Sequence, residues 1–175
     1  MLWLADSIEA IRDFMGLGGP VLKVIALTIF LMWAVIIERI LYFRTSMNAM
    51  SREIHDKWES RPERRSWNAL QIRELMISRF SEATNKGINL IQTLVALCPL
   101  LGLLGTVTGM ISVFQVMAVS GSGNVRAMAA GVSQATVPTM AGMVGALSGV
   151  LFVTLLTRRA AREVEFLEDS LTMDH

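Results

Sequence analysis

Two long runs without a charged residue dominate the second half of the chain and limit what it can fold into. The first run covers residues 87–125, the second covers residues 127–157, and Arg126 alone divides them. Each run exceeds the approximately 20 residues that a helix needs to cross a bilayer. Because 53% of the 175 residues are hydrophobic and the mean hydropathy is +0.49, the sequence predicts an integral membrane protein.

Small residues recur along both runs at helical spacing, which is typical of helices that approach each other closely in lipid. A glycine costs about 1 kcal/mol relative to alanine inside a helix, so close packing must offset the loss. The turn at residues 120–124 is short enough to make the two helices a hairpin, and Pro99 is expected to kink the first of them. The predicted packing glycines are Gly102, Gly105, Gly109, Gly131, Gly142, Gly145 and Gly149.

The first half of the chain holds one further apolar run and most of the charge. Residues 21–43 can cross the bilayer, with Lys23 near one interface and Glu38 and Arg39 near the other. Residues 44–86 carry nine Lys or Arg and six Asp or Glu, whereas residues 1–20 and the turn at 119–126 carry one basic residue each. The positive-inside rule therefore predicts that 44–86 is cytoplasmic and that the amino terminus lies outside.

These observations predict an all-α integral membrane protein with three transmembrane helices, long cytoplasmic helical extensions and N-out/C-in topology. The expected parts are a periplasmic amphipathic helix over 1–20, transmembrane helix 1 over 21–43, a cytoplasmic connector over 44–86, the transmembrane hairpin over 87–157 and a cytoplasmic tail over 158–175. The two small-residue stripes offer more close-packing surface than one hairpin can use, so a homo-oligomeric ring is expected.

The hairpin contains hydroxyl and amide side chains but no Asp, Glu or His. Such a chain cannot be a self-contained proton relay, because ion pathways across membranes commonly rely on a titratable group. A partner would have to bring that group. Thr106, Gln134 and Thr139 are the candidate pore-lining residues, although membrane Ser and Thr side chains often bond only to their own helix carbonyls.

Other chemistry finds little support in the sequence. There is no catalytic dyad, no phosphate-binding loop and no nucleophile beside a base, so an enzyme is not expected. The single Cys98 and the isolated His55 and His175 do not form a metal-ligand pattern, and no cofactor is predicted. The basic cluster RPERR at residues 61–65 favours anionic lipid headgroups or a solvated face over nucleic acid.

The segments GLLGTVTGMISVF and GVSQATVPTMAGMVGAL resemble the proton-channel core shared by the ExbB, TolQ and MotA proteins. The resemblance covers roughly residues 87–157, the order of elements agrees, and the short connector and tail look most like the compact ExbB proteins of second TonB systems. It implies a ring of five subunits in the bacterial inner membrane around an ExbD-like single-crossing partner with an essential aspartate. Proton flow would act through a TonB-like protein on outer-membrane import of iron chelates or vitamin B12.

The resemblance also implies roles for three residues. Thr106 is the threonine of the GLLGT motif, Thr139 is the threonine of the last crossing, and Gln134 stands where ExbB and TolQ usually hold a glutamate. An amide cannot take up a proton near neutral pH, which leaves H⁺ or Na⁺ open as the ion. A TolQ-like role in envelope maintenance, a flagellar stator and a passive scaffold for partner helices are the alternatives. The stator is the least favoured, since such proteins usually have four crossings.

Overall fold

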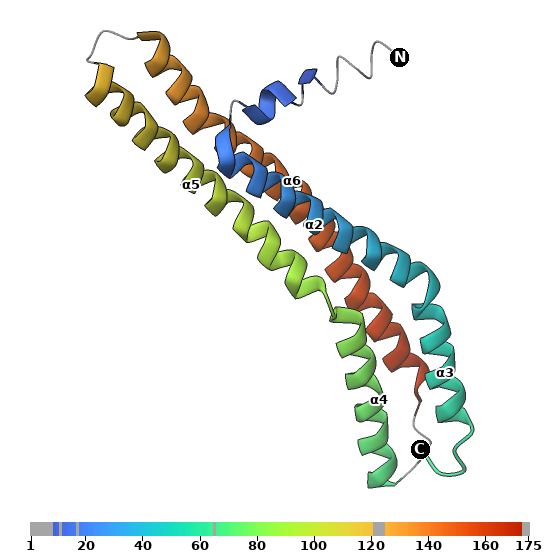
Figure 1. Cartoon of the computed structure of the whole chain (residues 1–175). Coiled ribbons are helices and arrows are strands. Elements are labelled where there is room, and N and C mark those ends of the chain that lie inside the picture. The colour runs from blue at the N-terminus through green and yellow to red at the C-terminus, as the bar shows by residue number, and fades with distance from the viewer. Residues whose placement is uncertain (1–8, 11, 17, 65, 121–124, 173–175) are drawn as a thin grey trace. The chain divides into compact units, whose positions relative to one another are not determined.

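The computed structural model describes residues 9–10, 12–16, 18–64, 66–120 and 125–172, and nearly all of them are helical (Figure 1). The helices are α2 (Gly19–Thr45), α3 (Met47–Glu59), α4 (Trp67–Asn85), α5 (Ile88–Ser120) and α6 (Val125–Ser170). Within this part of the chain three helices are long and apolar enough to cross a membrane, as the sequence predicted. Most of the expected amphipathic helix, including Leu4 and Ile8, and the turn at 121–124 lie outside the described residues.

The first apolar helix, α2, begins where the glycine and proline cluster ends. Gly19 has a φ of +65°, a backbone conformation that glycine accepts readily. Pro20 follows in the first turn, where its missing N–H removes no intrahelical hydrogen bond. The helix then continues as a single element for 27 residues.

The charged connector, for which the sequence predicted helical extensions, is helical on both sides of Pro62. Helix α3 ends at Glu59 and α4 begins at Trp67. The hydroxyl of Ser66 caps α4 by accepting a hydrogen bond from the Ala69 N–H at 3.2 Å.

A glycine separates α4 from α5. Gly87 has a φ of +84°, the Lys86 N–H closes α4 on the carbonyl of Glu82, and the Ile91 N–H opens α5 on the carbonyl of Gly87. The interruption therefore comes before Pro99, and α5 continues through that proline.

The chain divides into two compact units. The first contains Met1–Trp33 and Thr93–Val150, and the second contains Ala34–Gln92 and Leu151–His175. In the first unit α2, α5 and α6 pack on one another through small side chains. Its buried core includes Leu22, Ile25, Met32, Val95, Cys98, Val113, Ala135, Pro138 and Ala146.

The second unit packs α3 and α4 with the end of α6. The indole N–H of Trp58 donates to the carbonyl oxygen of Thr172 at 3.0 Å. Arg73 donates to the carbonyl oxygens of Leu171 at 2.7 Å and Glu168 at 2.8 Å. These side chains satisfy carbonyls that a helix C-terminus otherwise leaves without a donor.

Candidate functional site

Helices α5 and α6 touch backbone to backbone at three glycines of the first unit. A Cβ added at Gly109 would lie 2.5 Å from the Cα of Ala135, and one added at Gly142 would lie 2.5 Å from the carbonyl oxygen of Cys98. At Gly102 it would lie 3.0 Å from the Cα of Thr139. Backbones this close leave no room for a larger residue.

The other packing glycines meet side chains. Gly105 lies against the ring of Pro138, and Gly131 lies against Val113. Gly145 faces Ile29 of α2, so that part of α6 packs on α2 and not on α5.

Gly149 faces Val95 of α5 and Met32 of α2. All seven predicted packing glycines therefore make close contacts inside one chain. Their contacts do not support the expectation that the small-residue stripes are left free to pack against further copies of the chain.

Thr139 is the candidate residue that joins the two hairpin helices. Its hydroxyl donates to the carbonyl oxygen of Gly102 at 3.0 Å, across 37 residues of sequence. Interhelical hydrogen bonds in membranes are worth about 0.6 kcal/mol on average, so this bond adds little to helix association. The oxygen of Thr139 keeps its acceptor capacity for water or an ion.

The hydroxyl of Thr106 forms its hydrogen bond within its own helix, α5. It donates to the carbonyl oxygen of Leu103 at 2.7 Å, one turn back on the same helix. This is the common behaviour of a membrane threonine. Thr106 is half-buried, one residue beyond the glycine that packs on Pro138.

Gln134 belongs to α6, and its side chain lies beside the first residue of α2. A Cβ added at Gly19 would lie 2.6 Å from Nε2 of Gln134. Pro138 has no N–H, so the backbone carbonyl of Gln134 lacks its usual helical donor. Among the described residues, no hydrogen bond joins Thr106, Gln134 and Thr139 to one another.

The outer faces of the hairpin helices are apolar and exposed. Each of the following residues is at least half exposed: Leu100, Leu103, Leu104, Val107, Ile111 and Phe114 on α5, and Met140, Met143, Val144 and Leu147 on α6. Such faces suit lipid or other membrane helices. In the described part of the chain no group of three metal-ligating side chains occurs.

Sequence reasoning placed Arg39 near an interface, and the structure adds its surroundings. Arg39 is 5% exposed, and its guanidinium carbon lies 5.0 Å from the centroid of the Tyr42 ring. The neighbouring Glu38 is exposed. The sequence offered one signal for this burial, a basic residue inside an apolar run.

Comparisons with known proteins identify the family of the chain. Residues 41–169 match the MotA/TolQ/ExbB proton channel family. A Synechocystis sp. protein named ExbB-like 1 is 36% identical over 84 residues, which cover 46% of this chain and 33% of that protein. Biopolymer transport protein exbB1 of Vibrio cholerae is 39% identical over 88 residues, covering 50% of this chain and 39% of that protein. The matched segments thus span about a third to two fifths of these relatives.

Proposed function

Because the chain belongs to the MotA/TolQ/ExbB proton channel family, we propose that it is an ExbB-like subunit of an energy-transducing complex driven by the proton motive force. In this proposal it acts in the bacterial inner membrane with an ExbD-like and a TonB-like protein. The complex would power import of iron chelates or vitamin B12 across the outer membrane. The match of the family over residues 41–169, which include the whole hairpin over 87–157, carries this proposal.

The proposed role of the hairpin follows from what its side chains can and cannot do. No residue of 127–157 carries a charge, so this chain would supply walls, hydroxyls and an amide, and the partner would supply the carboxylate. Thr106, Gln134 and Thr139 would line the ion pathway. The half-buried hydroxyl of Thr139 supports this assignment because it lies at the α5–α6 contact and can still accept a hydrogen bond from water.

The proposed assembly is a homo-oligomeric ring, five subunits in the ExbB-type arrangement, with the amino terminus outside and 44–86 and 158–175 in the cytoplasm. Exposed apolar faces on both hairpin helices are compatible with neighbouring subunits and with lipid. The excess of Lys and Arg in 44–86 supports the orientation.

Proton uptake by liposomes tests this function. We expect liposomes that contain the chain together with its single-crossing partner to take up protons when a potential is applied, and liposomes with the chain alone to take up none. The acid of the partner replaced by its amide is the matched control and should abolish uptake. A complex that assembles but takes up no proton at any potential would leave the passive scaffold as the better interpretation.

A TolQ-like role in envelope maintenance is the second candidate, because the family covers both. Deleting the gene separates them. Loss of growth on iron chelates with an intact envelope supports the TonB-linked role, and detergent sensitivity with normal iron uptake supports the TolQ-like role.

A further inference from the structure

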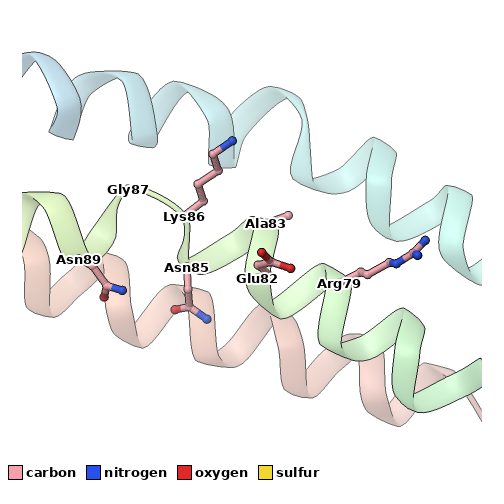
Figure 2. Close-up of a pocket in the computed structure, with 7 residues that line it drawn as sticks. All are labelled: Arg79, Glu82, Ala83, Asn85, Lys86, Gly87 and Asn89. Carbon is pink, nitrogen blue, oxygen red and sulfur yellow. The ribbon is translucent and has the colours of Figure 1, made fainter. Parts of the chain in front are cut away.

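The junction between α4 and α5 in the second unit forms an open surface pocket of about 550 Å³. Its lining includes Arg79, Glu82, Asn85, Lys86 and Gly87 (Figure 2). Gly87 precedes the first residue of α5, a helix of 33 residues. The first N–H groups of such a helix have no intrahelical acceptor and lie at the positive end of the helix dipole.

A buried guanidinium reaches the same glycine from α2. A Cβ added at Gly87 would lie 2.8 Å from Nε of Arg39 and 3.1 Å from its Nη2. Nε of Arg39 is fully buried and has no hydrogen-bond partner. Buried polar groups in proteins are almost always hydrogen-bonded, and an exception points to an ion, a water or a functional role.

The charge around the junction is positive. Arg79 and Lys86 line the pocket together with one carboxylate, Glu82. The buried Arg39 does not line the pocket but adds a third cation beside Gly87. Within the described residues none of these four side chains forms an ion pair, although Arg79 and Glu82 stand one helical turn apart. Figure 2 shows Arg79 and Glu82 on the last turns of α4, and Lys86 on the short non-helical link to Gly87 that follows.

We propose that this junction binds a phosphate-bearing anion. Guanidinium and ammonium groups together with a helix N-terminus form the usual chemistry of phosphate recognition. The phosphate comes either from the headgroup of an anionic phospholipid or from a free phosphate, and both present the same oxygens. This site is separate from the ion pathway and does not depend on the function proposed above.

Binding to the purified chain in a neutral detergent tests the site. Native mass spectrometry with added phosphatidylglycerol or phosphatidylcholine measures lipid binding, and thermal unfolding with inorganic phosphate measures the free anion. Near a membrane surface one Lys or Arg contributes about a fivefold change in the affinity for an anionic lipid. We therefore expect Arg79→Gln with Lys86→Gln to weaken phosphatidylglycerol binding about 25-fold.

The matched control is Arg52→Gln with Lys57→Gln, which removes two exposed cations from α3, outside the pocket. It should keep the preference for phosphatidylglycerol. Arg39→Gln should also weaken binding of phosphatidylglycerol. Circular dichroism shows whether this variant folds. If it does not fold, the comparison of Arg79→Gln with Lys86→Gln against the control decides whether the site exists. Stabilisation by inorganic phosphate, with equal binding of the two lipids, would identify a free phosphate as the ligand. No preference for phosphatidylglycerol together with no effect of phosphate would overturn the proposal, as would equal losses in the α4 variant and its control.

Discussion

At the scale of single residues, Thr139 makes one hydrogen bond between two helices and keeps the acceptor capacity of its oxygen. Its hydroxyl donates to the carbonyl oxygen of Gly102, a bond that links α5 to α6 but adds only about 0.6 kcal/mol to their association. Thr106 contributes nothing to the helix contact through its hydroxyl, because that group bonds to its own helix. Activity and assembly should therefore respond differently to losing the two hydroxyls.

Thr139→Val keeps the branched shape and removes the donor and acceptor. We expect proton uptake by the complex to fall at least tenfold, while stability falls by only about 0.6 kcal/mol and the size of the complex is unchanged. Uptake in liposomes and size-exclusion chromatography measure the two effects. Thr139→Ser, which retains the hydroxyl, is the control, and normal uptake by Thr106→Val combined with Thr139→Val would remove the case for a pathway at these residues.

Gly87→Ala examines the backbone at the α4–α5 junction. A left-handed conformation costs a residue with a Cβ roughly 1–2 kcal/mol, and the new Cβ would also displace the guanidinium of Arg39. We expect the free energy of unfolding to fall by about that amount. Gly16→Ala, where an added Cβ meets nothing within 4 Å, is the matched control. Equal stabilities of the two variants would show that the positive φ at Gly87 is not required.

At the scale of helices, the spacing of the small residues in the sequence predicted that they share a face of each helix and pack closely there. It could not predict which neighbour each glycine meets, because helical spacing fixes a face but not the helix packed against it. Gly109 meets backbone and Gly145 meets the end of Ile29, although both belong to the same kind of stripe. The burial of Arg39 escaped prediction for the same reason, since Gly87 lies 48 residues away in the sequence.

Gly109→Ala and Gly145→Ala test the difference between a glycine that contacts backbone and one that contacts a side chain. At Gly109 the new methyl group would collide with the backbone of Ala135, which cannot move unless the helices separate, and such overpacking costs about 1–3 kcal/mol. At Gly145 the new methyl group would meet side-chain atoms only, Cδ1 and Cγ1 of Ile29, which can shift more easily than a backbone, and the better helix propensity of alanine offsets part of the adjustment. Thermal unfolding in detergent should show a larger loss for the first variant than for the second. The opposite order would contradict the packing described for α5 and α6.

Arg73→Gln examines how the end of α6 is held in the second unit. Arg73 donates to two carbonyls there, and hydrogen bonds from a charged group contribute roughly 1.5–3 kcal/mol. We expect faster hydrogen exchange in the last turns of α6 and no change in α5. Arg52→Gln, an exposed substitution of the same type on α3, should leave exchange unaltered. Unchanged exchange in Arg73→Gln would mean that Trp58 alone secures this end.

At the scale of the whole molecule, charge is confined to particular segments. Nine of the 16 Lys and Arg residues lie in 44–86, and this asymmetry is what sets orientation in a membrane. Hydropathy and charge counts do not depend on packing, so the sequence alone predicted three apolar helices, which the structure contains, and an orientation for them, which stays a prediction. The number of copies in the complex depends on exposed faces that lipid could equally cover, so a single chain does not determine it.

Labelling of single cysteines tests the orientation, since the natural Cys98 is buried. Trp67 and Val119 are 73% and 89% exposed and lie at opposite ends of the α4–α5 segment. An impermeant maleimide added to intact cells should label Val119→Cys and not Trp67→Cys, and both after permeabilisation. Labelling of Trp67→Cys in intact cells would reverse the topology.

The anchoring of the end of α6 in the second unit has a mechanical consequence. There Leu167 and Leu171 are buried, and Trp58 and Arg73 donate hydrogen bonds to the carbonyl oxygens of Thr172, Leu171 and Glu168. The last turns of α6 therefore cannot rotate about their own axis alone, and any rotation of this segment has to carry α3 and α4 along with it.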